Sequence, residues 1–138
     1  MKPESGTINP RPARILVVDD ERHIARLLTH VLTRAGYETQ AVYDGEEALA
    51  AVEWFKPDGV LLDLDLPKLS GQEVLSRLRS NPKSARLKIL MLTGCPLQEG
   101  NVMDPLNCGA DAYCLKPIGP SVLIGLLRQH GLAGQPGI

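Results

Sequence analysis

Five side chains of the kinds that handle phosphate and metal ions stand at similar places in the chain, beside short apolar runs. Asp19 and Asp20 form an acidic pair after one run, Asp63 and Thr93 end two others, and Lys116 follows a fourth. If these runs are parallel strands of one open sheet, their carboxyl ends share the edge at which such sheets bind ligands. The sequence therefore predicts three carboxylates, one hydroxyl and one ammonium around a single shallow pocket.

These groups suit a phosphoryl transfer that depends on a metal ion. Three carboxylates close together repel one another unless their pKa values rise or a cation binds. Oxygen ligands without His or Cys favour Mg²⁺, which commonly serves a phosphate. Lys116 can neutralise one phosphoryl oxygen and Thr93 can donate its hydroxyl to another. One carboxylate then remains as the nucleophile of an acyl phosphate, and Asp63 is the natural candidate because its strand lies in the middle of the pocket.

Alternating strand and helix patterns must position these residues. Short aliphatic runs bounded by polar residues predict strands, and apolar residues at intervals of three and four predict helices. The expected strands cover residues 15–18, 37–42, 59–63, 88–93 and 111–115, and the expected helices cover 24–35, 44–55, 70–80, 96–108 and 120–130. Five such units predict an α/β fold, a flavodoxin-like doubly wound (βα)5 domain with five parallel strands in the order 2-1-3-4-5.

Local signals define several helix ends and faces. Asp44 with Glu47, and Ser70 with Glu73, resemble capping boxes, and Gly36 stands at a left-handed C-cap. The first helix is expected to bury Ile24, Leu27, Leu28, Val31, Leu32 and Ala35, and the last helix Val122, Leu123, Leu126 and Leu127.

Length and composition indicate one globular domain. The 138 residues suit a single domain, and 43% hydrophobic with 22% charged residues is close to the globular average. A net charge of −1 and an aromatic content of 4% argue against direct binding of nucleic acid. No apolar run reaches the length of a membrane span, so we expect no membrane partner.

The ends of the chain and its cysteines indicate domain limits and compartment. Residues 1–13 are Pro-rich and polar, so we expect a disordered tail, a folded domain over 14–132 and a flexible end over 133–138. Cys95, Cys108 and Cys114 form no CxxC pair, and the N-terminus is not signal-like. We therefore expect a reducing, cytoplasmic compartment.

Four segments together resemble the receiver domain of two-component response regulators, in its single-domain, chemotaxis-regulator-like form. They are ILVVDDE at 15–21, VLLDLDLPKLSG at 60–71, MLTG at 91–94 and GADAYCLKPI at 109–118. Each segment alone is a weak signal, but all four in this order and spacing are highly specific. The resemblance covers roughly residues 14–132, and no output domain fits after them, so we expect a stand-alone regulator or a fragment.

The resemblance implies an acidic centre with defined roles. Asp63 would be the phosphoacceptor. Asp19, Asp20 and Asp63 would bind Mg²⁺, or Mn²⁺ in its place, together with the backbone carbonyl of Asp65. The phosphodonor would be a histidine kinase or a histidine phosphotransfer protein, and the domain would catalyse only its own phosphotransfer and autodephosphorylation.

The resemblance also implies a switch. Thr93 would be the switch hydroxyl, Lys116 the phosphate-binding lysine and Tyr113 the switch aromatic, whose ring turns inward as Thr93 moves. A cis peptide bond would precede Pro117 and aim Lys116 into the pocket. Phosphorylation would then change a surface that binds a downstream protein, with the domain a monomer or a phosphorylation-dependent dimer.

Some features depart from the family pattern. Asp65 and Cys95 occupy the two positions that tune the lifetime of the phosphoryl group in the family, so we expect an altered lifetime. Gly100 and Pro105 interrupt the expected helix 96–108, which in the family contributes to the output surface.

Other interpretations remain open at this point. The receiver fold can serve as an adaptor that works without phosphorylation, although such modules usually lose some of the residues found here. The Asp63-Leu64-Asp65 sequence also resembles the start of haloacid-dehalogenase-type phosphatases. The basic run over 77–88 and the pair His23 and His30 are expected to be solvated surface, with partner docking as the alternative for both.

Overall fold

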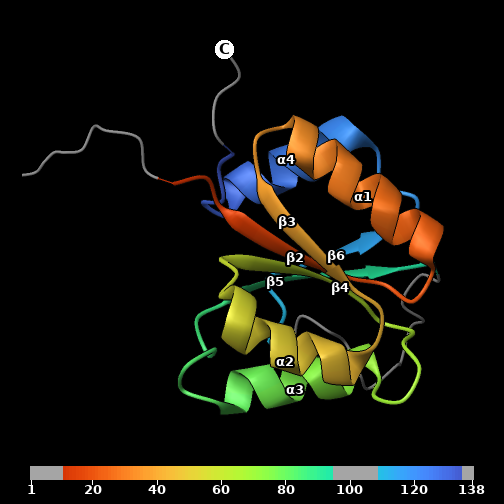
Figure 1. Cartoon of the computed structure of the whole chain (residues 1–138), viewed down its shortest axis with the longest axis vertical. Coiled ribbons are helices and arrows are strands. Elements are labelled where there is room, and N and C mark those ends of the chain that lie inside the picture. Colours follow the sequence, from red (N-terminus) through yellow and green to blue (C-terminus); the bar gives the residue numbers. More distant parts are fainter. Residues whose placement is uncertain (1–10, 95–108, 135–138) are drawn as a thin grey trace, which may run out of the picture.

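The computed structural model describes residues 11–94 and 109–134, in which strands and helices alternate (Figure 1). The order is β2 (Arg14–Val18), α1 (Arg22–Arg34), β3 (Glu38–Val42), α2 (Gly45–Phe55), β4 (Gly59–Asp63), α3 (Gly71–Ser80), β5 (Lys88–Thr93), β6 (Ala112–Leu115) and α4 (Pro120–Gln129). The expected elements within these ranges are confirmed, with small shifts at their ends. The helix expected over 96–108 lies outside the described residues.

All five strands are parallel and lie in the order β3-β2-β4-β5-β6. Numbered along the chain from one to five, this order is 2-1-3-4-5, so the predicted flavodoxin-like doubly wound topology is confirmed. The order reverses between β2 and β4, which pair directly with Val18 opposite Leu62. The carboxyl ends of these two strands therefore lie beside the crevice at which such sheets bind ligands.

Helices cover both faces of the sheet. α1 and α4 lie on one face, and α2 and α3 lie on the other (Figure 1). Alternate strand residues belong to two separate hydrophobic clusters, Leu16 and Leu62 on the side of α2 and α3, Ile15 and Leu61 on the side of α1 and α4. Because both faces are covered, β4 is buried at every position, as its continuous apolar sequence predicts.

Two helices begin at the expected caps. Asp44 Oδ1 accepts a hydrogen bond from the amide of Glu47 at 2.8 Å, and Ser70 Oγ accepts one from the amide of Glu73 at 3.2 Å. Gly36 follows α1 with a φ of 96°, the left-handed conformation expected after a helix. These local signals define the starts of α2 and α3 and the end of α1.

Two residues expected in the core lie at the surface. Leu27 of α1 has an exposed fraction of 57%, and Val122 of α4 one of 62%. Successive helical residues point about 100° apart, so a residue next to the buried stripe can face the solvent. In α4 the fully buried stripe consists of Leu123 and Leu127. The apolar helix faces predicted from the sequence are therefore wider than the buried faces in the structure.

Hydrogen bonds also join residues close to both ends of the described range. The guanidinium of Arg11 donates two hydrogen bonds to Asp58, at 3.2 and 3.3 Å, and the amide of Ala13 donates one to the carbonyl of Ala133 at 3.1 Å. The two ends of the described chain therefore contact each other, and the N-terminal one also contacts the residue before β4. Within residues 11–94 and 109–134, no helix has the length and apolar character needed to cross a membrane.

Candidate functional site

The acidic residues lie at the carboxyl ends of two central strands. Asp19 directly follows β2, Asp63 is the last residue of β4, and the pairing of these strands brings the two carboxylates together. Asp19 and Asp63 are buried, whereas Asp20 is exposed. One carboxylate oxygen from each of the three residues lies within 4.8 Å of the others. The expected convergence of Asp19, Asp20 and Asp63 is present.

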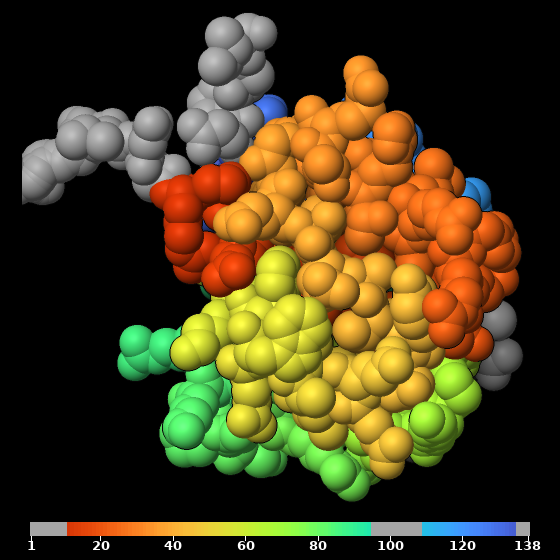
Figure 2. Space-filling model, in the orientation of Figure 1, coloured from red at the N-terminus to blue at the C-terminus, as the bar shows by residue number. Residues whose placement is uncertain are grey.

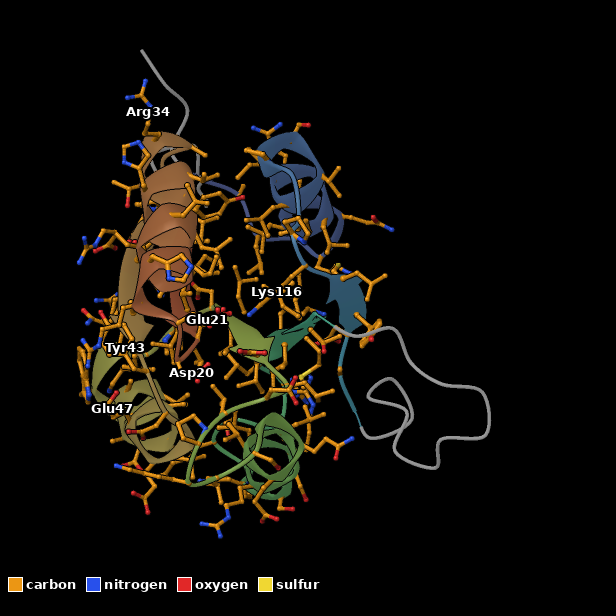
Figure 3. All side chains as sticks on the ribbon, turned by 90° about the vertical axis from the view of Figure 1, so that its right-hand side faces the viewer. Asp20, Glu21, Arg34, Tyr43, Glu47 and Lys116 are labelled. Carbon is orange, nitrogen blue, oxygen red and sulfur yellow. The ribbon has the colours of Figure 1, made fainter. Side chains whose placement is uncertain are left out.

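Lys116 bridges the two buried carboxylates. Its ammonium lies 2.7 Å from Asp19 Oδ2, 3.2 Å from Asp63 Oδ2 and 3.8 Å from Glu21 Oε1. Figure 3 shows Lys116 near Glu21 and Asp20, where α1 begins. Burial alone would lower the pKa of Lys116, but the hydrogen bonds and charges of Asp19 and Asp63 outweigh burial and raise this pKa. The lysine therefore stays charged inside the pocket.

The two oxygens of Asp63 have different partners. Oδ1 accepts a hydrogen bond from the amide of Asp65, and Oδ2 accepts one from Lys116, both at 3.2 Å. Burial is the main reason that the pKa of Asp63 is raised to about 6. The charge of Lys116 opposes this rise and the charge of Asp19 adds to it. The Asp63 carboxylate is therefore held in an environment that favours an additional positive charge.

The acidic cluster fits a hard divalent cation. Asp19 Oδ1 accepts a hydrogen bond from the amide of Glu21 at 3.0 Å. Asp19 Oδ2 is buried, and apart from its ionic contact with Lys116 it has no well-aligned hydrogen bond within the described residues. Among the described residues, three carboxylates around one ammonium leave a surplus of negative charge, and Asp20 is exposed to solvent. Such a set of oxygens suits Mg²⁺, which takes one or two carboxylates and keeps several waters.

Thr93 and Tyr113 come from the neighbouring strands. Thr93 ends β5, is buried, and accepts a hydrogen bond through its carbonyl from the amide of Lys116 at 2.7 Å. The peptide bond between Lys116 and Pro117 is cis, the geometry expected at that position. Tyr113 pairs with Met91 across the β5–β6 ladder and is half-buried against the hydrophobic cluster on the side of α2 and α3. Thr93 and Lys116 therefore share the pocket edge, and Tyr113 lies farther back along β6.

Close packing fixes the connection between Asp63 and α3. A Cβ atom at Gly71 would collide with the carbonyl of Asp63, so glycine alone allows α3 to begin this close to β4. Lys68 adopts a φ of 65°, and its ammonium lies 3.3 Å from Asp44 Oδ2 at the start of α2. Asp65, on the same connection, has an exposed side chain. These contacts fix the backbone that carries the Asp65 carbonyl expected at the metal.

Glu21 is a neighbour of the site that was not expected from the sequence. Its carboxylate reaches Lys116 from the segment between β2 and α1, and its place directly after Asp19 and Asp20 was the available signal. His23 and His30 are exposed on α1, as expected. The position of Cys95, expected to tune the lifetime of the phosphoryl group, lies outside the described residues.

Known proteins share this sequence pattern over most of the chain. The family described as response regulator receiver domain matches residues 15–128. The alkaline phosphatase synthesis transcriptional regulatory protein PhoP of Bacillus subtilis is 46% identical over 107 residues, which cover 78% of this chain and 43% of PhoP. The DNA-binding response regulator MtrA of Mycobacterium tuberculosis is 42% identical over 115 residues, 83% of this chain and 49% of MtrA. The chain spans about half the length of these relatives.

Solved structures share the fold. The chemotaxis response regulator CheY4 of Vibrio cholerae has a TM-score of 0.78 and 31% identity, covering 86% of this chain and 98% of that chain. The receiver domain of the sensor histidine kinase PA1611 of Pseudomonas aeruginosa, solved with a magnesium ion in its active-site cleft, has a TM-score of 0.78 and 29% identity over 86% of this chain and 96% of that one. These matches favour a receiver domain over a haloacid-dehalogenase-type phosphatase as the context of the Asp63 motif. The chain belongs to the response regulator receiver domain family, the signalling domain of two-component systems.

Proposed function

We propose that this receiver domain accepts a phosphoryl group on Asp63 from a histidine kinase or a histidine phosphotransfer protein. The observation that carries the proposal is the buried contact of Lys116 with both Asp19 and Asp63, beside the exposed Asp20. An oxygen of Asp63 forms a bond to phosphorus while the bond from phosphorus to the donor histidine nitrogen breaks, and that nitrogen keeps the electron pair. The product is an aspartyl phosphate.

The proposed cofactor is Mg²⁺, with Mn²⁺ as a substitute. Asp19, Asp20, Asp63 and the backbone carbonyl of Asp65 would hold the ion. When bound, it neutralises negative charge on the phosphoryl oxygens and on the attacking carboxylate. The surplus of carboxylates over ammonium groups and the raised pKa of Asp63 support this assignment.

Lys116 and Thr93 are proposed to bind the transferred group. The ammonium of Lys116, 3.2 Å from Asp63, is placed to pair with one phosphoryl oxygen, and the Thr93 hydroxyl donates to a second. Phosphorylation adds about −1.5 to −2 charges and three acceptor oxygens, which draw both groups toward Asp63. The half-buried ring of Tyr113 then follows Thr93, and the surface around β6 and α4 changes its affinity for a downstream protein.

The remaining properties follow from the same proposal. Asp65 lies two residues after Asp63 and has an exposed side chain. Its charge can repel the phosphoryl group or orient a water molecule. Asp65, together with Cys95, is therefore proposed to set the rate of autodephosphorylation.

We propose a folded domain over 14–132, a cytoplasmic location, and a monomer or phosphorylation-dependent dimer without direct contact with nucleic acid or membrane.

Intact mass after incubation with Mg²⁺ and acetyl phosphate tests the proposal. We expect the parent protein to gain one phosphoryl group, and we expect no gain without Mg²⁺ or in Asp63→Asn. The same samples are titrated with beryllofluoride, which mimics the phosphoryl group. Absence of both the mass gain and Mg²⁺-dependent beryllofluoride binding would favour an adaptor that works without phosphorylation.

A further inference from the structure

A second candidate site lies at the opposite edge of the sheet, between α2, α3 and the connection from α3 to β5. A cavity of about 830 Å³ opens there, within the usual size range of ligand pockets. Its apolar lining comes from Leu49 and Val52 of α2, and from Leu78 and Leu87 on the other side. In Figure 2 the yellow atoms of α2 and the green atoms of α3 and its following connection meet on the lower part of the visible face. We call this cavity the α2–α3 pocket.

Charged side chains surround the apolar lining. The basic ones are Lys56, Arg77, Lys83 and Arg86, and the acidic ones are Glu53 and Asp58. Asp58 is already matched, because it accepts two hydrogen bonds from Arg11 and one from the amide of Arg14. Arg77 is matched by Glu73, at 3.1 Å on the same helix. The charge balance at the pocket therefore depends on the other four residues.

Three cations at the pocket remain available to a ligand. Lys56, Lys83 and Arg86 are exposed, and none of them forms an ion pair within the described residues. Lys83 is fixed in a tight turn, since its amide donates to Asn81 Oδ1 at 3.0 Å. Among the described residues that line the pocket, Glu53 is the one carboxylate left to oppose these three cations. The pocket is therefore electropositive although the whole chain carries a net charge of −1.

The backbone at Lys56 supports a role for its side chain. Lys56 ends α2 in the left-handed conformation, with φ 54° and ψ 61°, where glycine is the favoured residue. A side chain in this conformation is strained relative to a right-handed or extended backbone. The chain thus keeps a long cation at a position where glycine would be easier to accommodate, and this position lies at the pocket.

We propose that the α2–α3 pocket binds an acidic peptide segment of a partner protein. An aliphatic side chain of the segment fits among the leucine and valine side chains, and its neighbouring carboxylates pair with Lys56, Lys83 and Arg86. The described residues that line the pocket include no aromatic ring on which a nucleobase could stack, so the lining favours aliphatic groups. The site lies at the amino end of β4, opposite Asp63, so the partner can stay bound in both phosphorylation states, and the proposal does not depend on phosphorylation.

A titration followed by two-dimensional amide NMR tests this proposal. The probe is an acetylated octapeptide of alternating glutamate and leucine, and the control peptide has glutamine in place of every glutamate. We expect saturable shifts confined to α2, α3 and residues 81–87 with the acidic peptide. The dissociation constant should rise at least tenfold in the double variant Lys83→Glu/Arg86→Glu, and it should rise with added salt.

The matched control is Arg128→Glu, which reverses an exposed cation in the last turn of α4, on the other face of the sheet. This variant should bind the acidic peptide within about twofold of the parent protein. Because Lys83, Arg86 and Arg128 are all exposed, the variants should keep the parent circular-dichroism spectrum. Shifts that are absent at millimolar peptide, equal for the glutamine peptide, or equally weakened by Arg128→Glu would overturn the proposal.

Discussion

Two ionic clusters at opposite edges of the sheet differ in how fully their charges are paired. At the amino edge, Arg79 of α3 donates from Nε to the carbonyl of Gly109 at 2.7 Å and from Nη2 to Asp111 at 2.9 Å. Its Nη1 donates to the carbonyls of Ala85 and Leu87. Every nitrogen of this guanidinium thus has an acceptor, and each acceptor comes from a segment near the start of β5 or β6.

The carboxyl edge has the opposite balance. In the part of the chain that the structure describes, one ammonium, that of Lys116, faces the buried carboxylates of Asp19 and Asp63 and the more distant one of Glu21. The pKa of Asp63 is raised to about 6, mainly by burial, so the cluster is under electrostatic strain in the absence of a further cation. A matched cluster stabilises the fold, whereas the unmatched one is the site proposed to take up a metal ion and a phosphoryl group.

The largest expected effect concerns the matched cluster. Arg79→Ala removes an ion pair and three hydrogen bonds to backbone carbonyls, and it leaves Asp111 with the amide of Ile89 as its remaining partner in the described structure. We expect the free energy of unfolding to fall by about 3 kcal/mol, because the partners left behind are partly buried. Urea denaturation measures the change.

Arg77→Ala is the matched control for Arg79→Ala. Arg77 lies on the same helix, but its partner Glu73 is an exposed residue four positions earlier. Such a pair contributes about 0.5 kcal/mol or less. Similar losses in the two variants would mean that the matched cluster contributes no more to stability than a surface ion pair.

The second effect concerns the unmatched cluster. Without metal, Asp63→Asn should stabilise the domain by about 1–2 kcal/mol at pH 7.5, because it removes a buried charge while Lys116 keeps Asp19 as a partner. The folded pKa of Asp63 is raised, so the parent protein should lose stability as pH rises from about 4, the ordinary Asp value, to about 6. The variant should lack this loss.

Thermal unfolding at several pH values, with EDTA or with Mg²⁺, checks this expectation. Mg²⁺ should stabilise the parent more than Asp63→Asn, because binding to the folded state shifts the unfolding equilibrium. Asp65→Asn is the control, since the side chain of Asp65 is exposed. A parent protein that is more stable than Asp63→Asn in EDTA at pH 7.5 would contradict the view of a strained cluster.

The two clusters also differ in how far the sequence predicts them. Asp63, Thr93 and Lys116 could be placed together because each stands at the end of a short apolar run and parallel topology brings such ends to one edge. Arg79 could not be distinguished from the other cations of the run over 77–88, for which solvated surface was the expectation. Its acceptors Gly109 and Asp111 lie 30 and 32 positions away in sequence, and no local pattern encodes their contact.

The width of the buried helix faces could likewise not be predicted from the sequence. Periodicity locates α1 and α4, but Leu27 and Val122 belong to the periodic pattern and are exposed. The width of a buried face depends on how closely a helix approaches the sheet and its neighbouring helix. The pattern of residues within one helix does not contain that information, whereas caps such as Asp44 depend on neighbours within four residues and were predictable.

The smallest effect concerns Asp44, whose carboxylate has one amide and one exposed ammonium as partners. Asp44 accepts a hydrogen bond from the amide of Glu47 and contacts the more exposed ammonium of Lys68. Asp44→Ala should destabilise the domain by about 1 kcal/mol at neutral pH, as the loss of a helix cap typically does.

The effect of Asp44 should depend on pH. The amide of Glu47 is the main reason that the pKa of Asp44 is lowered, so the stabilising effect of this carboxylate is present above about pH 4 and is lost as pH falls further. Ser70→Ala removes an uncharged cap of α3 and should give a similar loss at every pH. Urea denaturation at pH 7 and at pH 3 separates the two, and a pH-independent loss in Asp44→Ala would mean that geometry rather than charge makes this carboxylate a cap.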